Sequence, residues 1–142
     1  MSKNLEFTDK LRSSGLRPTK QRLKICEVLF NRDITFHFTV NNLAERISKE
    51  LNEKISLATV YNTVHAFKNK GYLKEISINS DKSYFDTNTT NHHHFFDEDT
   101  NELIDCSEEV IETPKIKKNI SGKKINSVEV LVKVASDNQN QK

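Results

Sequence analysis

Hydrophobic residues recur every three or four positions through the first half of the chain, a period typical of amphipathic helices. The pattern predicts a short helix over 5–14 and a second over 20–30, for which Thr19 is the candidate N-cap. A third helix is predicted after Thr39, and a fourth begins after Ser56. Because each of these caps directly precedes an apolar repeat, the first half is predicted to be helical.

Beyond Gly71, where the fourth helix is expected to stop, the apolar period shortens toward two, as in strands. The predicted strands are 73–78 with 83–86, 95–96 with 103–104, and the alternating valines of 128–134. Helices followed by a hairpin predict a winged helix, and the remainder predicts a small β-rich module. We therefore expect an α+β protein with a domain over 1–88, a second over 89–135, and a disordered tail over 136–142.

Charge is distributed unevenly along the 142 residues, although the formal net charge is only +2. Residues 1–75 carry 14 Lys or Arg against 8 Asp or Glu, whereas residues 76–113 carry 1 against 10. This asymmetry indicates a polyanionic partner for the first half and a cation for the middle of the chain. Composition also excludes some classes of site, since two cysteines and three glycines supply neither a paired CxxC zinc site nor a glycine-rich phosphate loop.

The N-terminus, MSKNLEFTDK, lacks the apolar core of a signal peptide, and no stretch approaches the roughly 20 apolar residues of a membrane span. We therefore expect a cytoplasmic protein without a membrane partner.

The fourth predicted helix has two different faces. Leu57, Val60, Val64 and Phe67 form the predicted inward stripe, and Ala58, Tyr61, Asn62, His65 and Asn69 lie opposite. An outer face with amides, one aromatic ring and no acid suits a DNA major groove, where Asn can pair with adenine. Nearby basic residues would contact phosphates: Arg17, Lys20, Arg22, Lys68, Lys70 and Lys74. The alternative is an ordinary amphipathic helix with a solvated polar face.

Three consecutive histidines, His92, His93 and His94, precede an acidic stretch. In an extended segment the first and third side chains point one way and the second points the other. Two imidazoles with a carboxylate suit Zn²⁺, Fe²⁺ or Mn²⁺, and imidazole also binds haem iron. The alternative is a solvated polar turn.

Several segments resemble the Fur (ferric uptake regulator) family: GLRPTKQRL at 15–23, SLATVYNTV at 56–64, SYFDTN at 83–88 and HHHFF at 92–96. Within the family the chain is most similar to the Irr (iron response regulator) branch, which is associated with haem-dependent control of iron and haem metabolism. The resemblance implies a homodimeric winged-helix transcription regulator, usually a repressor, that binds a double-stranded DNA operator and has an α/β dimerisation and effector-binding domain. Its implied DNA-binding residues are Arg17, Lys20, Arg22, Ser56, Thr59, Tyr61, Asn62 and His65. Most members have Arg where this chain has Asn62.

The resemblance also implies a regulatory site for a divalent metal or haem. Its implied ligands are His37, Asp86, His92, His93 and His94, with Asp105 as a further acid. Such a site would join the two domains. The CxxC pairs that hold a structural zinc in many relatives are missing, because Cys106 stands alone and Cys26 lies on an apolar helix face.

Two effector hypotheses stay open. One is an iron-responsive regulator acting through haem or metal, and the other is a Fur-type repressor activated directly by Fe²⁺, Mn²⁺ or Zn²⁺. An enzyme is not expected, because no HExxH motif, nucleophile elbow or paired acid motif is present. A metal-storage module is the remaining alternative, although it would have no use for the basic helical half.

Overall fold

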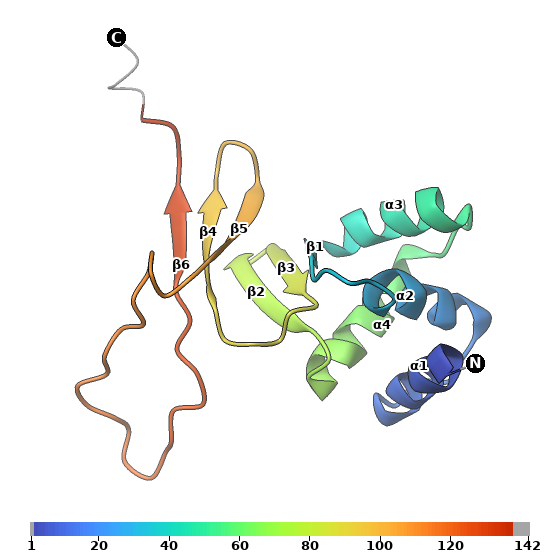
Figure 1. Cartoon of the computed structure of the whole chain (residues 1–142), viewed down its shortest axis with the longest axis horizontal. Coiled ribbons are helices and arrows are strands. Elements are labelled where there is room, and N and C mark those ends of the chain that lie inside the picture. Colours follow the sequence, from blue (N-terminus) through green and yellow to red (C-terminus); the bar gives the residue numbers. More distant parts are fainter. Residues whose placement is uncertain (1, 138–142) are drawn as a thin grey trace. The chain divides into compact units, whose positions relative to one another are not determined.

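The computed structural model describes residues 2–137. Its contacts divide into two compact units, one ending at Thr89 and the other beginning at Thr90. The elements of the first unit are α1 (Ser2–Ser13), α2 (Lys20–Phe30), β1 (His37–Phe38), α3 (Val40–Leu51), α4 (Leu57–Lys70), β2 (Lys74–Asn79) and β3 (Lys82–Asp86), as Figure 1 shows. Those of the second are β4 (His93–Asp97), β5 (Glu102–Cys106) and β6 (Leu131–Val134). Among the described residues, no helix is long and apolar enough to cross a membrane.

The predicted caps all form. Thr19, Thr39 and Ser56 each accept a hydrogen bond from the backbone N–H three residues later, at 3.1–3.2 Å. Thr39 is part of a capping box, because the side chain of Asn42 accepts from the Thr39 N–H. Helix α4 ends at Gly71, whose φ of 94° lies in the left-handed region that glycine adopts readily.

The core of the first unit lies where the apolar faces of the helices meet. Its fully buried members include Leu11, Ile25, Cys26, Leu29, Leu43, Ile47, Val60, Val64 and Phe67. The interpretation of Cys26 as a core residue is confirmed. The prediction for one residue of the inward stripe is wrong, because Leu57 is 51% exposed, and Thr63 is buried instead. Leu57 is the first residue of α4, where the helix has not yet reached the packed region.

The sheet of the first unit has the strand order β1-β3-β2 and is antiparallel throughout. Its β2–β3 hairpin is the predicted one, whereas the two-residue strand β1 was not predicted. Strand β1 lies directly before the Thr39 cap of α3. The sheet thereby brings the start of the third helix beside the end of the hairpin.

The second unit has the strand order β5-β4-β6, in which β4 pairs antiparallel with β5 and parallel with β6. The hairpin over 93–106 agrees with the prediction. The valine strand is shorter than predicted and begins at Leu131. Between Thr90 and Asp137 the structure contains strands and loops but no helix, and residues 107–130 form a long connection that includes Pro114.

Of the predicted tail, residues 138–142 lie outside the described part. At its start, the N–H and hydroxyl of Ser136 both donate to Asp99 Oδ2 at 2.5 Å.

Candidate metal centre and nucleic-acid interface

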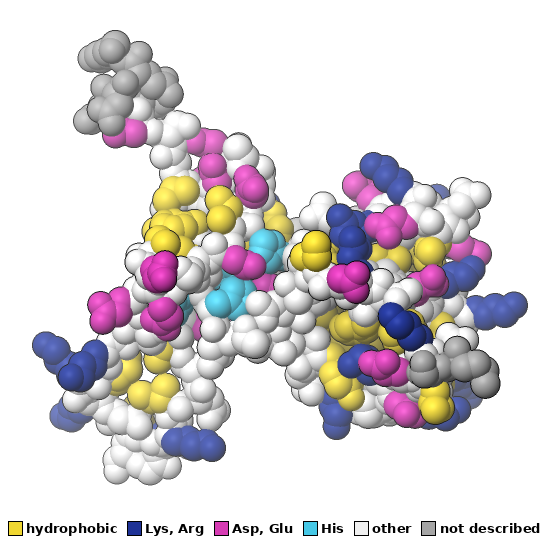
Figure 2. Space-filling view, in the orientation of Figure 1, with side chains coloured by type: hydrophobic (Ala, Val, Ile, Leu, Met, Phe, Trp, Pro, Cys, Tyr) yellow, Lys and Arg dark blue, Asp and Glu magenta, His cyan; other side chains and the backbone are white. Residues whose placement is uncertain are grey.

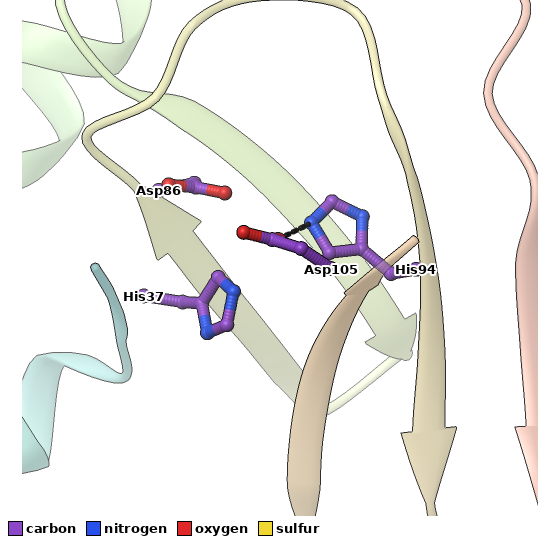
Figure 3. A group of neighbouring side chains, drawn as sticks. All are labelled: His37, Asp86, His94 and Asp105. Carbon is purple, nitrogen blue, oxygen red and sulfur yellow. Dashed lines mark ion pairs between the residues drawn. The ribbon is translucent and has the colours of Figure 1, made fainter. Parts of the chain in front are cut away.

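A histidine and an aspartate lie opposite each other in the first unit. His37 in β1 and Asp86 at the end of β3 are cross-strand partners, and one ligand atom of each lies within 4.8 Å of the other (Figure 3). The pairing continues past Asp86, because Thr87 and Phe36 exchange backbone and side-chain hydrogen bonds at 3.1–3.4 Å. Asp86 is 1% exposed, and its Oδ1 accepts from the N–H of Asn88 at 2.8 Å. A carboxylate buried this deeply favours a cationic neighbour.

A second histidine–aspartate pair occurs in the second unit, again across two strands. His94 in β4 is the cross-strand partner of Asp105 in β5, and Nε2 lies 3.1 Å from Oδ1, along the dashed line in Figure 3. His92 approaches the same oxygen, with its Nε2 at 3.2 Å. The rings of His92 and His94 have centroids 4.4 Å apart. One carboxylate oxygen of Asp105 is therefore in contact with two imidazole nitrogens.

The geometry of His92 favours a cation beside Asp105. Its Nδ1 lies 2.7 Å from the carbonyl oxygen of Thr90, so this nitrogen carries the proton and donates it. In the neutral ring Nε2 then has a lone pair, which faces the carboxylate oxygen of Asp105. A second proton on the ring, which makes it an imidazolium, or a metal ion between the two atoms would supply the positive charge that joins them.

His93 points away from the other two histidines, as strand alternation predicts. Its Nδ1 accepts from the N–H of Val130 at 2.9 Å, so Nε2 carries the proton that it donates to Thr113 Oγ1 at 3.0 Å. The hydroxyl and the backbone N–H of Thr113 both donate to the Glu108 carboxylate, and these two hydrogen bonds lower the pKa of Glu108. His93 thus hydrogen-bonds two points of the connection 107–130, Thr113 and Val130, to β4. It is not among the residues whose ligand atoms lie close together.

Each pair supplies one imidazole nitrogen and one carboxylate. Zn²⁺, Fe²⁺ and Mn²⁺ accept nitrogen and oxygen ligands of these kinds. Asp105 was indicated by the resemblance alone. The periodicity of β5 could not reveal it, because its position opposite His94 depends on how β4 and β5 pair. Both cysteines are free and buried.

Helix α4 presents the predicted outer face. Tyr61 is 51% exposed, and Ala58, Asn62 and Asn69 are exposed as well. His65 is half-buried, because its ring packs against that of Tyr61 with a centroid distance of 4.1 Å. The hydroxyls of Ser56 and Thr59 are joined by a hydrogen bond of 2.9 Å at the start of the helix. The exposed groups available to a base edge are therefore two amides and a phenol ring.

Three of the six predicted phosphate contacts lie near the start of α2, and the other three lie at the end of α4 and the start of β2. Arg17 and Lys20 are exposed, and Arg22 is half-buried because it donates to the carbonyl oxygen of Arg17 at 3.0 Å. Lys68 is paired with Glu75 at 3.2 Å. On the face of the helical unit seen in Figure 2, basic and acidic side chains are interspersed. Arg17, Lys20 and Lys70 are thus the more accessible of these cations.

Comparison with known proteins places these features in a family. The model of the ferric uptake regulator family matches residues 13–134. A peroxide-responsive repressor, PerR, from Staphylococcus aureus is 35% identical over 95 residues, which is 67% of this chain. The matched stretch spans 62% of the length of that relative.

Two solved structures share the fold. The ferric uptake regulator of Vibrio cholerae has a TM-score of 0.67 at 26% identity, covering 91% of this chain and 98% of that one. The Pseudomonas aeruginosa regulator, whose structure contains manganese, has a TM-score of 0.64 at 22% identity over 92% and 97% of the two chains. These likenesses confirm the predicted α+β fold, and because family members are transcription regulators, the prediction that the chain is not an enzyme is also confirmed. The chain belongs to the ferric uptake regulator family.

Proposed function

We propose that the chain is a DNA-binding transcription regulator that acts as a homodimer and is switched by a divalent cation held by His37, Asp86, His94 and Asp105. The observation that carries this proposal is the pair of cross-strand His–Asp contacts, one in each unit. Each is built on a register that places one imidazole against one carboxylate. One relative is named as a repressor, which supports a regulatory role, and another was solved with manganese, which supports a divalent cation.

The switch follows from the position of the two pairs in the chain. His37 and Asp86 belong to the unit that carries α4, whereas His94 and Asp105 belong to the other. One ion bound by both pairs would restrict how the two units are oriented and would favour one arrangement over others. His92 would assist by facing the carboxylate of Asp105. The effector would then control DNA affinity by selecting an arrangement of the units in the dimer.

In the DNA-binding step, α4 would lie in the major groove. Tyr61 and Asn62 would contact base edges, with thymine methyl groups and adenine as the matching chemistry. Arg17 and Lys20 would contact phosphates and set the register of the helix. Asn62, where most relatives have Arg, removes a cation from this face and is expected to change the target sequence. A homodimer would read two half-sites related by symmetry, and a DNA partner implies a cytoplasmic location.

The metal identity we propose is iron, with Mn²⁺ as its stable substitute. The resemblance to the Irr branch supports a second candidate effector, haem, and the adjacent imidazoles of His92 and His94 favour it. The two aspartates favour the bare ion, because haem iron already has four porphyrin nitrogens and takes axial ligands such as His, Cys, Met or Tyr. The bare ion is therefore the leading proposal, and haem is an outcome of the test.

The test begins with selection of a binding sequence from a random DNA pool by the purified full chain. Fluorescence anisotropy then measures the affinity for that sequence with chelator, Mn²⁺, Zn²⁺ or haem. We expect Mn²⁺ to strengthen binding and Asp105→Asn to abolish this response, while Asp137→Asn, also exposed in the second unit, retains it. If haem releases the DNA and Mn²⁺ has no effect, haem is the effector instead of the bare ion. Selection of no sequence under any condition would refute the proposed function.

A further inference from the structure

The exposed ring of Tyr61 is supported from one side by His65. The two residues lie one turn apart on α4, with ring centroids 4.1 Å apart and an interplanar angle of 35°. An exposed tyrosine without such a neighbour samples several rotamers, and fixing one of them on binding costs entropy. Because His65 already packs against the ring, Tyr61 is held in a limited range of orientations before DNA arrives.

His65 is held in turn by the sheet of the first unit. The ring of Phe85 in β3 meets it edge-on, with centroids 5.3 Å apart and an interplanar angle of 78°. Phe85 is 2% exposed and stacks on Phe38 of β1 at 6.0 Å. Phe38 is also 2% exposed. The four rings therefore form a continuous packed series from the interior of the unit to its outer helix face.

The buried end of this series adjoins the first His–Asp pair. Phe38 follows His37 in β1, and Phe85 precedes Asp86 in β3, so the two aromatic residues form the next cross-strand pair of the same ladder. A change in the separation of His37 and Asp86 moves the two strands that carry Phe38 and Phe85. Close-packed aromatic rings pass such a displacement on rather than absorbing it.

We propose that His65 and Phe85 are positioning residues for Tyr61, and that the ring series links the occupancy of His37 and Asp86 to base recognition. This inference rests on the proposed function and describes how metal binding would affect DNA recognition within the first unit. The charged neighbour of the series is Glu75, which lies opposite Phe85 in β2. It is paired with Lys68 at 3.2 Å and also interacts electrostatically with His65.

The first test concerns the orientation of Tyr61 and needs no DNA. In proton NMR of the full chain, the ring resonances of Tyr61 should carry a ring-current shift from His65. His65→Ala should remove this shift, and His65→Phe, which keeps a ring at the position, should retain one. Asn69→Ala, one turn further along the same face, is the matched control and should leave the shift unchanged. Identical Tyr61 resonances in His65→Ala and the wild type would overturn the positioning role even if DNA binding were never detected.

The second test uses the selected DNA sequence and a scrambled one. We expect His65→Ala to weaken specific binding roughly 3- to 10-fold, the range expected for one aromatic contact, with little change on scrambled DNA. In a Tyr61→Ala background the same substitution should have no further effect, because its action passes through Tyr61. An equal loss in both backgrounds would show that His65 contacts DNA by itself and would overturn the proposal.

The link to the metal pair is tested by Phe85→Leu, which keeps an apolar side chain in the core and removes the ring. We expect Mn²⁺ still to bind this variant but to raise its DNA affinity by a smaller factor than in the wild type. A full Mn²⁺ response in Phe85→Leu would overturn the link. A wild-type chain that binds its sequence equally with and without Mn²⁺ would instead refute the metal switch of the proposed function.

Discussion

Asp86→Asn is the substitution that separates a metal ligand from an ordinary buried acid. The side chain keeps its size, and the oxygen that accepts from the N–H of Asn88 at 2.8 Å can be kept, but the negative charge is lost. Asp86 is 1% exposed, so water cannot replace what the carboxylate does. If this carboxylate serves a cation, its removal should affect the protein only when the cation is present.

The magnitude follows from the linkage between binding and stability. At a free Mn²⁺ concentration of 100 times Kd, binding stabilises the wild type by about 2.7 kcal/mol. Loss of even an outer-shell partner of a metal site weakens binding about 10- to 100-fold, and loss of a ligand weakens it at least as much. At the same Mn²⁺ concentration the variant should therefore keep no more than about 0.4–1.4 kcal/mol of stabilisation. In chelator, the variant should be as stable as the wild type or slightly more stable, because burying an amide costs less than burying a carboxylate.

The assay is thermal unfolding of wild type and variant in Mn²⁺ and in chelator, with calorimetric titration of Mn²⁺ into each protein. Asp81→Asn is the matched control, since Asp81 lies in the exposed turn between β2 and β3 of the same unit. The control should gain as much stability from Mn²⁺ as the wild type. An undiminished gain in Asp86→Asn would refute the assignment of Asp86 as a ligand.

Three further predictions concern the scaffold and its titrating groups. Phe67→Ala should destabilise the first unit by about 3–5 kcal/mol in urea unfolding, because Phe67 is 0% exposed, and a loss below 1 kcal/mol would contradict its place in the core. Burial raises the pKa of the Cys26 thiol to about 12, so a thiol reagent at pH 8 should modify Cys26 only in unfolded protein, and rapid labelling of native Cys26 would contradict this. Burial opposes ionisation of Glu75, but hydrogen bonds from Ser83 and Lys68 prevail and lower its pKa below the usual 4.5. Because the pKa of Glu75 is lower in the folded state, its carboxylate contributes stability above pH 4.5, and this contribution is lost as the pH falls through the folded-state pKa. The difference in unfolding free energy between wild type and Glu75→Gln should therefore shrink in acid. A difference that grew in acid would contradict the lowered pKa.

The helices of the first unit were predictable from the sequence because their signals are local. A cap such as Thr39 hydrogen-bonds three residues away, and a stripe such as Val60, Val64 and Phe67 recurs within one helix. The outer face with Tyr61 follows from the same periodicity. Leu57 was misassigned because the helical period shows which face of a helix a residue lies on but not where along the helix its packing against the core begins.

The strand pairings of the candidate metal centre were decided only by the tertiary structure. β1 has two residues, too few for a periodic signal, and it pairs with a strand that lies far along the chain. The register of these pairings brings His37 to Asp86 and His94 to Asp105, and a shift by one residue would turn each side chain to the other face of its sheet. Sequence could name histidines and acids as candidate ligands, since ligand chemistry belongs to each residue alone. Which of them meet depends on backbone hydrogen bonds between distant segments, and that information exists only in the folded chain.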